Sequence, residues 1–161
     1  KDFVYRIKKR KKAEILMKAV IQRVCGATLS VGGETVSQIG KGLAVYFCAE
    51  KGDNENLCSS LANKLVNLRV FEDENGKMNL SVKDVKGEIL FVSQFTLAAD
   101  TSKGNRPSFF NAEEPERAKR LYLQTADILR GLGVAAKTGV FGADMIIEQI
   151  NDGPVTIILR F

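Results

Sequence analysis

The segment Ser93-Gln94-Phe95-Thr96 ends the strongest predicted strand, residues 87–97, with three polar side chains. Strand alternation places Gln94 and Thr96 on one face of this strand and Ser93 on the other. Polar groups at the end of an apolar strand need hydrogen-bond partners or a ligand. A hydroxyl here could serve as the nucleophile of an acyl transfer. Alternatively, the strand simply leaves the core with its hydroxyls bonded to neighbouring backbone.

Histidine is absent from the sequence, which restricts the chemistry open to any hydroxyl or thiol. Its absence removes Ser–His and Cys–His pairs, histidine general bases and histidine metal ligands. The cysteines Cys25, Cys48 and Cys58 are odd in number and widely spaced, without a C-x-x-C pair. We therefore expect reduced thiols, no disulfide framework, no metal site and no cofactor. Cys25 and Cys48 lie in apolar runs, so we predict that both are core residues.

A second polar segment, residues 151–156, separates two apolar runs and contains Gly153-Pro154. Asn-Asp-Gly followed by Pro is ordinary turn chemistry and is compatible with a simple hairpin loop. An X-Pro bond can also be cis, and the preceding glycine has no side chain to obstruct a ligand. Such a segment could present backbone carbonyls as a rigid steric gate.

The segment 139–145 places Phe141 between two glycines, an arrangement that suits either a base-stacking platform or a loop packed on the core. The glycine-rich stretches match neither dinucleotide nor triphosphate-binding motifs. Lys103 and Arg106 lie in a polar loop, where they either meet phosphates or only solvate the loop.

The remaining pattern predicts an α+β domain in which strands and two helices alternate with short connections. Predicted strands cover residues 17–25, 27–31, 34–39, 42–49, 70–71, 78–82, 87–97, 134–137, 145–150 and 155–161. Gly32-Gly33 and Asn75-Gly76 predict hairpin turns. Asp53 is predicted to cap a helix that ends near residue 68, and Asn111 a helix that ends near 131. The continuous apolar run at 42–49 predicts a strand buried on both faces.

The formal net charge of +5 belongs entirely to residues 1–16, because residues 17–161 hold equal numbers of acidic and basic side chains. We interpret 1–16 as a basic leader, an upstream or artificial segment outside the fold, and 17–161 as one domain. The leader lacks the apolar segment of a secretory signal. No apolar run approaches the roughly 20 residues that span a bilayer. A soluble, cytoplasmic protein without membrane partners is expected.

Five segments together resemble the D-aminoacyl-tRNA deacylases. They are MKAVIQRV at 17–24, FEDENGKMNLSV at 71–82, SQFTLAADTSKGNRPSF at 93–109, TGVFGADM at 138–145 and NDGPVTI at 151–157. The resemblance covers essentially all of residues 17–161 in order, and the leader is not part of it.

The resemblance implies a barrel-like α+β homodimer with two main helices and with active sites at the interface. It implies hydrolysis of the ester between a D-amino acid and the 3′-terminal adenosine of tRNA, and removal of glycine mischarged on tRNA(Ala). The matching motif assigns catalysis to Ser93, Gln94, Phe95 and Thr96. It also assigns Gly153 and Pro154 to a chiral gate offered to the partner's pocket, Arg23 to its support, and Phe141 and Met145 to the adenosine.

Two mechanisms remain open for this motif. Thr96 could be a nucleophile that forms an acyl-enzyme, although no histidine is present to act as its base. Alternatively, the 2′-hydroxyl of the terminal adenosine assists, while backbone amides of Phe95 and Thr96 stabilise the oxyanion. We favour substrate assistance. A non-catalytic RNA-binding module that stacks a base on Phe141 is the rival hypothesis.

Overall fold

The computed structural model describes residues 17–161, so the predicted leader lies outside the described residues. The elements in chain order are β1 (Lys18–Val31), β2 (Glu34–Ile39), β3 (Gly42–Cys48), α1 (Asn56–Asn67), β4 (Phe71–Glu72), β5 (Met78–Leu80), β6 (Glu88–Ser93), the 3₁₀ helix η1 (Phe95–Ala98), α2 (Pro115–Gly131), β7 (Ala135–Thr138) and β8 (Ile146–Arg160). The predicted hairpins at Gly32-Gly33 and Asn75-Gly76 are confirmed as the β1–β2 and β4–β5 connections. None of the helices within 17–161 is long and apolar enough to cross a membrane.

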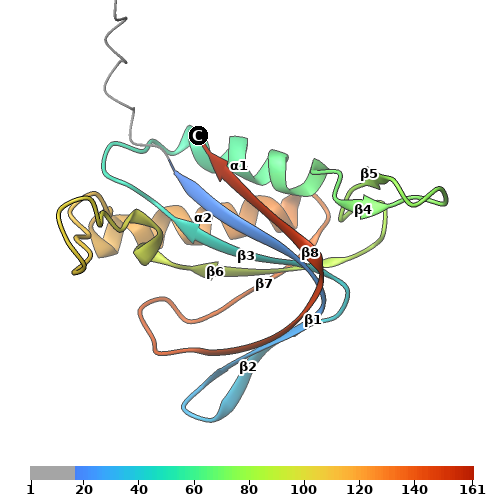
Figure 1. The fold of residues 1–161 in the computed structure, drawn as a ribbon, viewed down its shortest axis with the longest axis horizontal. Helices are drawn as coiled ribbons and strands as arrows, with labels where there is room; N and C mark the ends of the chain where they lie inside the picture. Colours follow the sequence, from blue (N-terminus) through green and yellow to red (C-terminus); the bar gives the residue numbers. More distant parts are fainter. Residues whose placement is uncertain (1–16) are drawn as a thin grey trace, which may run out of the picture.

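The six-stranded mixed sheet is organised around β1, the long curved strand at its centre. The first half of β1 pairs antiparallel with β3 and its second half with β2, while β8 follows the other edge of β1. Strands β3, β6 and β7 run parallel to one another. The sheet curls into a nearly closed barrel, and α1 and α2 lie together on one side of it (Figure 1). The predicted α+β class with a barrel-like sheet and two main helices is confirmed.

The two faces of the sheet bury separate apolar clusters. The larger cluster lies between the sheet and the two helices, where Phe47, Phe91 and Tyr122 pack with ring centroids 5.2–6.1 Å apart. The Tyr122 hydroxyl donates a 2.7 Å hydrogen bond to the Phe91 carbonyl, which satisfies its polar group within the core. The smaller cluster takes the alternate residues of the same strands, on the other face of the sheet, and includes Leu29 and Leu90. Burial on both faces fixes β3 and β6 firmly, as the continuous apolar run at 42–49 predicts.

The carboxyl ends of the three parallel strands meet at one edge of the sheet, at Cys48, Ser93 and Thr138. The segments that follow these strands must therefore lie next to one another. In open parallel sheets, ligands bind beyond the carboxyl ends of the strands. This edge is where the chain can assemble a site from distant parts of the sequence.

The predicted strand 87–97 ends earlier than its apolar pattern suggests. Strand β6 stops at Ser93: the Gln94 amide makes the last hydrogen bond to β3, 2.6 Å long, at the Phe47 carbonyl, and the 3₁₀ turn of η1 begins at Phe95. The expected alternation of Gln94 and Thr96 on one strand face is therefore wrong. Instead the motif folds into a tight turn at the end of β6.

Two pairs of predicted strands are single strands in the structure. Residues 17–25 and 27–31 merge into β1, and 145–150 and 155–161 merge into β8, because β1 and β8 pair along almost their whole length. Register shifts around Val24 and Gly26 absorb the irregular segment 151–154. The same irregularity turns both Arg23 and Val24 inward and leaves Cys25 exposed, so its predicted place in the core is wrong. Cys48 is buried as predicted.

Both predicted helix caps are wrong. Glu55 precedes α1, and the Asp53 carboxylate instead accepts hydrogen bonds from the backbone amides of Met17 and Glu50. Glu114 precedes α2, whose first residue is Pro115. Asn111 contributes its carbonyl to the backbone amide of Lys51 rather than capping the helix. The Asp53 carboxylate, a side chain that favours capping, is thus used instead by backbone amides at the start of β1 and after β3.

Candidate active site

A cavity of about 670 Å³ lies at the carboxyl ends of β3 and β6. Four segments form its wall: the end of β3, the end of β6, the start of α2 with the loop before it, and the loop between β7 and β8. The lining residues are Phe47, Cys48, Ala49, Lys51, Val92, Ser93, Gln94, Phe95, Phe109, Ala112, Glu113, Glu114, Pro115, Ala118, Phe141, Gly142, Ala143, Asp144, Met145 and Ile147. The cavity is mainly apolar, with a few polar groups near its mouth, as is usual for a small-ligand site.

Five of the residues predicted from sequence meet in this cavity. Ser93, Gln94 and Phe95 come from the end of β6, whereas Phe141 and Met145 come from the loop before β8. Thr96 follows directly but is exposed and does not line the wall. The fold therefore joins the Ser-Gln-Phe-Thr segment to the Phe141 segment across more than forty residues of sequence.

The Thr96 hydroxyl is bonded to its own motif rather than to a base. The Gln94 side-chain amide donates a 2.6 Å hydrogen bond to Thr96 Oγ1. An amide N–H is a donor and cannot accept the hydroxyl proton. Among residues 17–161, no carboxylate or amine makes a hydrogen bond to this hydroxyl. The geometry positions Thr96 without activating it as a nucleophile.

Aromatic rings border the cavity on two sides. Phe95 is 56% exposed and makes an edge-to-face contact with Phe109 at 5.1 Å. Phe141 packs against the buried Tyr122 with ring centroids 6.1 Å apart. The rings leave an apolar slot that suits a planar group such as a nucleobase. Phe109 was not singled out by the sequence, although it ends the third matching segment.

Gly139 allows the β7–β8 loop to pack closely against the barrel. A Cβ at this position would lie 2.5 Å from Met145 Sδ and 2.9 Å from Leu29 Cδ1. A side chain at residue 139 would therefore push Met145 away from its place in the cavity wall. Close packing against Met145 and Leu29, and not turn geometry, therefore explains why residue 139 of the TGVFGADM segment is glycine.

The Cys48 thiol lies in the cavity wall but is unsuited to nucleophilic attack. Burial, followed by the nearby Glu50 charge, raises the pKa of Cys48 to about 11. The thiol is therefore protonated near neutral pH, and only the thiolate is strongly nucleophilic. A protonated, buried thiol argues against Cys48 as a nucleophile.

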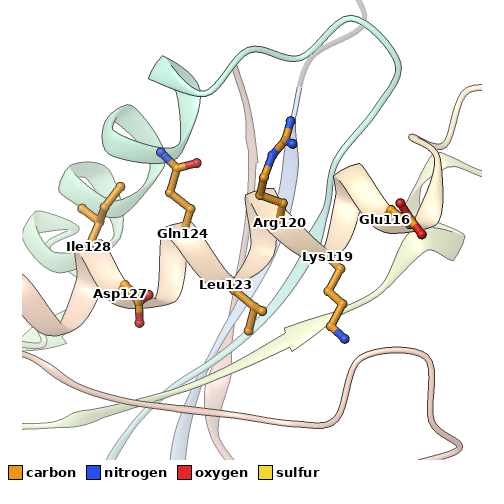
Figure 2. A pocket seen from close by; sticks show the side chains of 7 residues that line it. All are labelled: Glu116, Lys119, Arg120, Leu123, Gln124, Asp127 and Ile128. Carbon is orange, nitrogen blue, oxygen red and sulfur yellow. The ribbon is translucent and has the colours of Figure 1, made fainter.

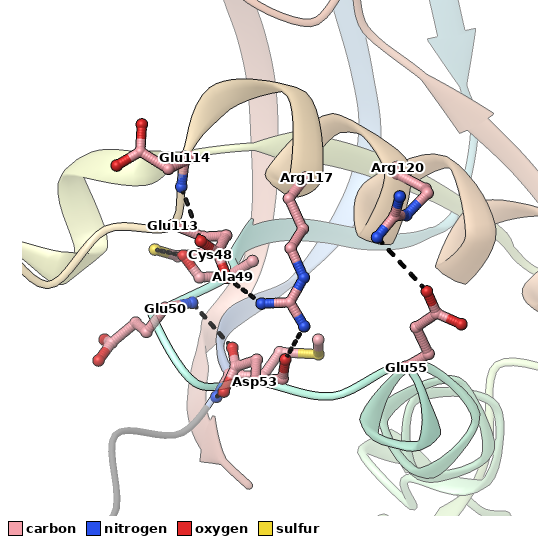
Figure 3. A network of polar contacts seen from close by, with 10 residues as sticks. Cys48, Ala49, Glu50, Asp53, Glu55, Glu113, Glu114, Arg117 and Arg120 are labelled. Carbon is pink, nitrogen blue, oxygen red and sulfur yellow. Dashed lines mark hydrogen bonds and ion pairs between the residues drawn. The ribbon is translucent and has the colours of Figure 1, made fainter.

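A buried polar network fixes the wall formed by the start of α2 (Figure 3). Arg117 pairs with the Glu113 carboxylate and also donates to the backbone carbonyl of Asp53. The buried Glu50 carboxylate faces the Lys18 ammonium. These contacts tie the α2 end of the cavity to the ends of β1 and β3.

Asp53 is the member of this network whose ionised form is disfavoured by burial. Its side chain is 1% exposed, and burial raises the pKa of Asp53 to about 6. Hydrogen bonds from the backbone amides of Glu50 and Met17 oppose this effect but do not cancel it. Ionised Asp53 therefore lowers the free energy of unfolding relative to the protonated group.

A second feature lies in the middle of β8, where Arg23 anchors the segment containing Gly153 and Pro154. Arg23 is 7% exposed, and its guanidinium donates to the carbonyls of Asp152 at 2.9 Å and Val70 at 2.8 Å. It also pairs with the Asp152 carboxylate at 3.2 Å. Gly153-Pro154 is a cis peptide and both residues are exposed. The predicted support residue and gate segment are thus adjacent.

One chain does not bring this gate segment to the cavity. Arg23 pairs with Leu43 near the start of β3, whereas the cavity begins at Phe47 near its end. Five residues from Leu43 to Cys48 span about 16 Å of strand. Figure 1 shows the bend of β8 on the opposite side of the barrel from the loop between η1 and α2. Neither Gly153 nor Pro154 lines the cavity.

The outer face of α2 carries a shallow depression that lacks such a convergence. Its side chains all come from one helix, and Glu116, Lys119, Arg120 and Asp127 give it mixed charge (Figure 2). Within residues 17–161 no cluster of three His, Cys, Asp or Glu side chains could hold a metal ion. The cavity at the parallel strand ends remains the site with convergent chemistry.

Similarity to known proteins extends over most of the chain. The family model described as D-Tyr-tRNA(Tyr) deacylase matches residues 20–160. A D-aminoacyl-tRNA deacylase of Paracoccus denitrificans (strain Pd 1222) is 54% identical over 88% of this chain and 95% of its own length. One of Dehalococcoides mccartyi (strain ATCC BAA-2266 / KCTC 15142 / 195) is 57% identical over 89% and 94%.

Solved structures share the fold. The structure of a protein named "c-Myc DNA Unwinding Element Binding Protein" has a TM-score of 0.84 and 45% identity, covering 88% of this chain and 97% of its own. A probable eukaryotic D-amino acid tRNA deacylase has a TM-score of 0.78 at 16% identity, covering 90% and 99%. The second match supports the architecture alone.

Proposed function

This chain belongs to the D-Tyr-tRNA(Tyr) deacylase family, and from that membership we propose that it hydrolyses the ester bond of D-aminoacyl-tRNA. The observation that carries the proposal is the meeting of Ser93, Gln94 and Phe95 with Phe141 and Met145 in one cavity. The apolar aromatic slot suits the terminal adenosine, and the polar end of β6 suits the ester.

Hydrolysis is assisted by the substrate in this proposal. Water adds to the ester carbonyl, the bond between that carbon and the ribose oxygen breaks, and the ribose oxygen takes a proton. The neighbouring ribose hydroxyl helps to move this proton, since the described residues offer no side-chain base to Thr96. Backbone amides of Phe95 and Thr96 stabilise the oxyanion.

Gln94 and Thr96 act as a positioning pair. Their 2.6 Å hydrogen bond orients the Thr96 hydroxyl and holds the turn after β6. The backbone amide of Gln94, bonded to the Phe47 carbonyl, fixes the same turn to β3. The protein thus supplies a preorganised ester site rather than a covalent nucleophile.

Stereochemical selection resides in Gly153 and Pro154, which act as a chiral gate. Because these residues lie far from the cavity of their own chain, the gate serves the cavity of a second copy in a homodimer. Exposed apolar side chains of β8 on either side of the gate, Ile146, Ile150 and Ile158, supply contact surface for that copy. Arg23 holds the gate through the Asp152 carbonyl.

The gate works by exclusion. Backbone carbonyls beside the α-carbon collide with an L side chain, whereas a D side chain points out of the pocket. Glycine has no side chain to collide, so glycine mischarged on tRNA(Ala) is also removed. Broad tolerance among D side chains follows from the same geometry.

The deciding experiment is deacylation of matched D-Tyr-tRNA and L-Tyr-tRNA, with gel-filtration measurement of the oligomeric state. Rapid loss of the D ester alone supports both the reaction and the gate. Equal loss of both esters keeps the hydrolase and removes the gate. Binding of tRNA without turnover would overturn the proposed function in favour of a nucleic-acid-binding protein, the role stated in the name of the 45% identical protein.

A further inference from the structure

Among residues 17–161, the most exposed large aromatic side chain outside the cavity is Phe110, in the loop between η1 and α2. Phe110 is 77% exposed, and the Lys51 ammonium lies 4.2 Å from its ring centroid. Burying such a ring would remove a large apolar area from water, so its exposure needs a reason. A cation on one face of the ring leaves the other face free for stacking.

A second cavity of about 350 Å³ adjoins this ring. It is lined by Asp100, Lys103, Arg106, Ser108, Phe110 and Asn111. Its lining thus holds two cationic side chains and one carboxylate, and Lys51 adds a third cation on the Phe110 ring. The combination of an exposed aromatic ring with several cations is the usual surface for single-stranded nucleic acid.

Asp100 offsets only one of the three positive charges of Lys51, Lys103 and Arg106, and its carboxylate is engaged within the loop. The Ser102 backbone amide donates to Asp100 Oδ1 at 2.9 Å and holds the pKa of Asp100 below its usual value. Backbone hydrogen bonds join Asp100 to Ser108 in both directions. Asp100 therefore shapes the loop that presents Lys103 and Arg106.

The two cavities share a wall. Lys51 lines the larger cavity while its ammonium covers Phe110 of the smaller one, and Phe109 lines the larger cavity beside it. The backbone amide of Lys51 donates to the Asn111 carbonyl at 2.9 Å, which pins the loop to the end of β3. Phe110 therefore lies next to the residues that line the larger cavity.

We propose that Phe110 and Lys51 form a stacking platform for the unpaired nucleotide that precedes the terminal adenosine of the substrate, with Lys103 and Arg106 binding its phosphates. The inference rests on the proposed function, which places the terminal adenosine in the larger cavity. It assigns a binding surface for the single-stranded acceptor end, built by the loop between η1 and α2. Charge complementarity and continuity with the cavity select RNA as the occupant.

The test compares kcat/KM for D-Tyr-tRNA with kcat/KM for D-tyrosyl-adenosine, which lacks the preceding nucleotides. The Phe110→Ala variant should lower the ratio of the two values about tenfold, the order expected for one lost stacking contact. Phe110→Tyr, which keeps the ring, should restore the ratio to within about twofold. Leu123→Ala, an exposed apolar change on α2, is the matched control and should leave the ratio unaltered.

A direct binding measurement separates this inference from the proposed function. Binding of an RNA oligonucleotide ending in CCA should weaken about tenfold in Phe110→Ala. Arg106→Gln should reduce the slope of log K against log salt by roughly 0.7, the value for one single-strand phosphate contact. If wild type hydrolyses neither substrate, the proposed function fails while the oligonucleotide still tests the platform. Equal loss on both substrates, or unaltered oligonucleotide binding, would overturn the platform.

Discussion

The cavity at the parallel strand ends and the gate segment of β8 are built in opposite ways. The cavity draws on four segments, and its wall is held by a network of buried carboxylates and cations that includes Asp53 and Arg117. The gate is a short exposed stretch of one strand, held chiefly by the single buried guanidinium of Arg23. One region encloses a ligand, whereas the other presents backbone to the outside.

This contrast suits the two regions to different functions, ester binding in the cavity and stereochemical selection at the gate. An enclosed apolar site can bind and orient an ester, but it has no evident means of rejecting one stereoisomer. A rigid exposed backbone can reject a side chain, but it has no cavity of its own. In the proposed dimer each chain supplies the reaction at one site and the selection at the other.

The largest effect is expected from removing the guanidinium that holds the gate. Arg23→Met leaves the carbonyls of Val70 and Asp152 without a donor and the Asp152 carboxylate without its partner. We expect the free energy of unfolding to fall by about 3 kcal/mol. The ratio of kcat/KM for D-Tyr-tRNA to kcat/KM for L-Tyr-tRNA should also fall in this variant. Urea unfolding followed by far-UV circular dichroism measures the stability, because the chain has no tryptophan.

Arg69→Met is the matched control for this change. Arg69 also bonds a backbone carbonyl, that of Asn79, but it is exposed, so the loss should stay below about 1 kcal/mol. Arg23→Lys should fall between wild type and Arg23→Met, since one ammonium cannot reach both carbonyls. An Arg23→Met protein as stable as wild type would show that the gate does not depend on this anchor.

Asp53, in the network beside the cavity, should make the free energy of unfolding depend on pH, whereas the gate anchor should not. The pKa of Asp53 is about 6 in the folded protein and 3.8 for the unperturbed group, so the folded state binds more protons between these values. The free energy of unfolding therefore falls as pH rises through this window and the loss is complete above pH 6. At 1.36 kcal/mol per pH unit, the change amounts to about 3 kcal/mol.

The Asp53→Asn variant isolates this contribution. Asparagine loses one acceptor for the amides of Met17 and Glu50, so the variant starts less stable at pH 4. Its stability relative to wild type should then improve as pH rises to 7. Asp127→Asn, on the exposed face of α2, serves as the control. A constant difference between wild type and Asp53→Asn from pH 4 to 7 would refute the assigned pKa.

The sequence predicts the two regions to different extents. Local chemistry is enough for the Gly32-Gly33 hairpin and for the buried strand β3, because turn geometry and burial on both faces leave direct traces in residue type. Five of the cavity residues, Ser93, Gln94, Phe95, Phe141 and Met145, could be named from two sequence segments. Their meeting depends on the parallel order of β3, β6 and β7, which no local pattern specifies.

The errors fall where long-range pairing overrides local preference. Asn151-Asp152-Gly153-Pro154 has the composition of a turn, yet it remains within β8 because β1 pairs along both sides of it. Asp53 has the composition of a cap, yet its carboxylate is taken by the start of β1. In both cases the competing partner is more than thirty residues away in sequence.

Substitution of Gly153 tests the gate while Arg23 itself is kept. A Cβ at this position would lie 2.3 Å from the Val155 amide nitrogen, so the backbone must shift. A displacement of about 1 Å can cost roughly 100-fold in a positioned reaction. We expect Gly153→Ala to lower the D-to-L ratio of kcat/KM by about that factor. Arg160→Gln, later in the same strand, is the control, and an unaltered ratio in Gly153→Ala would remove the gate from this segment.

The smallest effect is expected from substituting Thr96, which tests whether the cavity positions the ester or attacks it. Because the Gln94 amide donates to Thr96 Oγ1, the hydroxyl positions the turn and does not attack the ester. Thr96→Ala should therefore lower kcat by less than about tenfold, the cost of one positioning hydrogen bond. Loss of a nucleophile would instead lower kcat by more than about 10⁴-fold with substrate binding retained. Measuring kcat and KM separately for Thr96→Ala and Thr96→Ser distinguishes these outcomes, because an acyl-enzyme route would retain turnover in the serine variant alone.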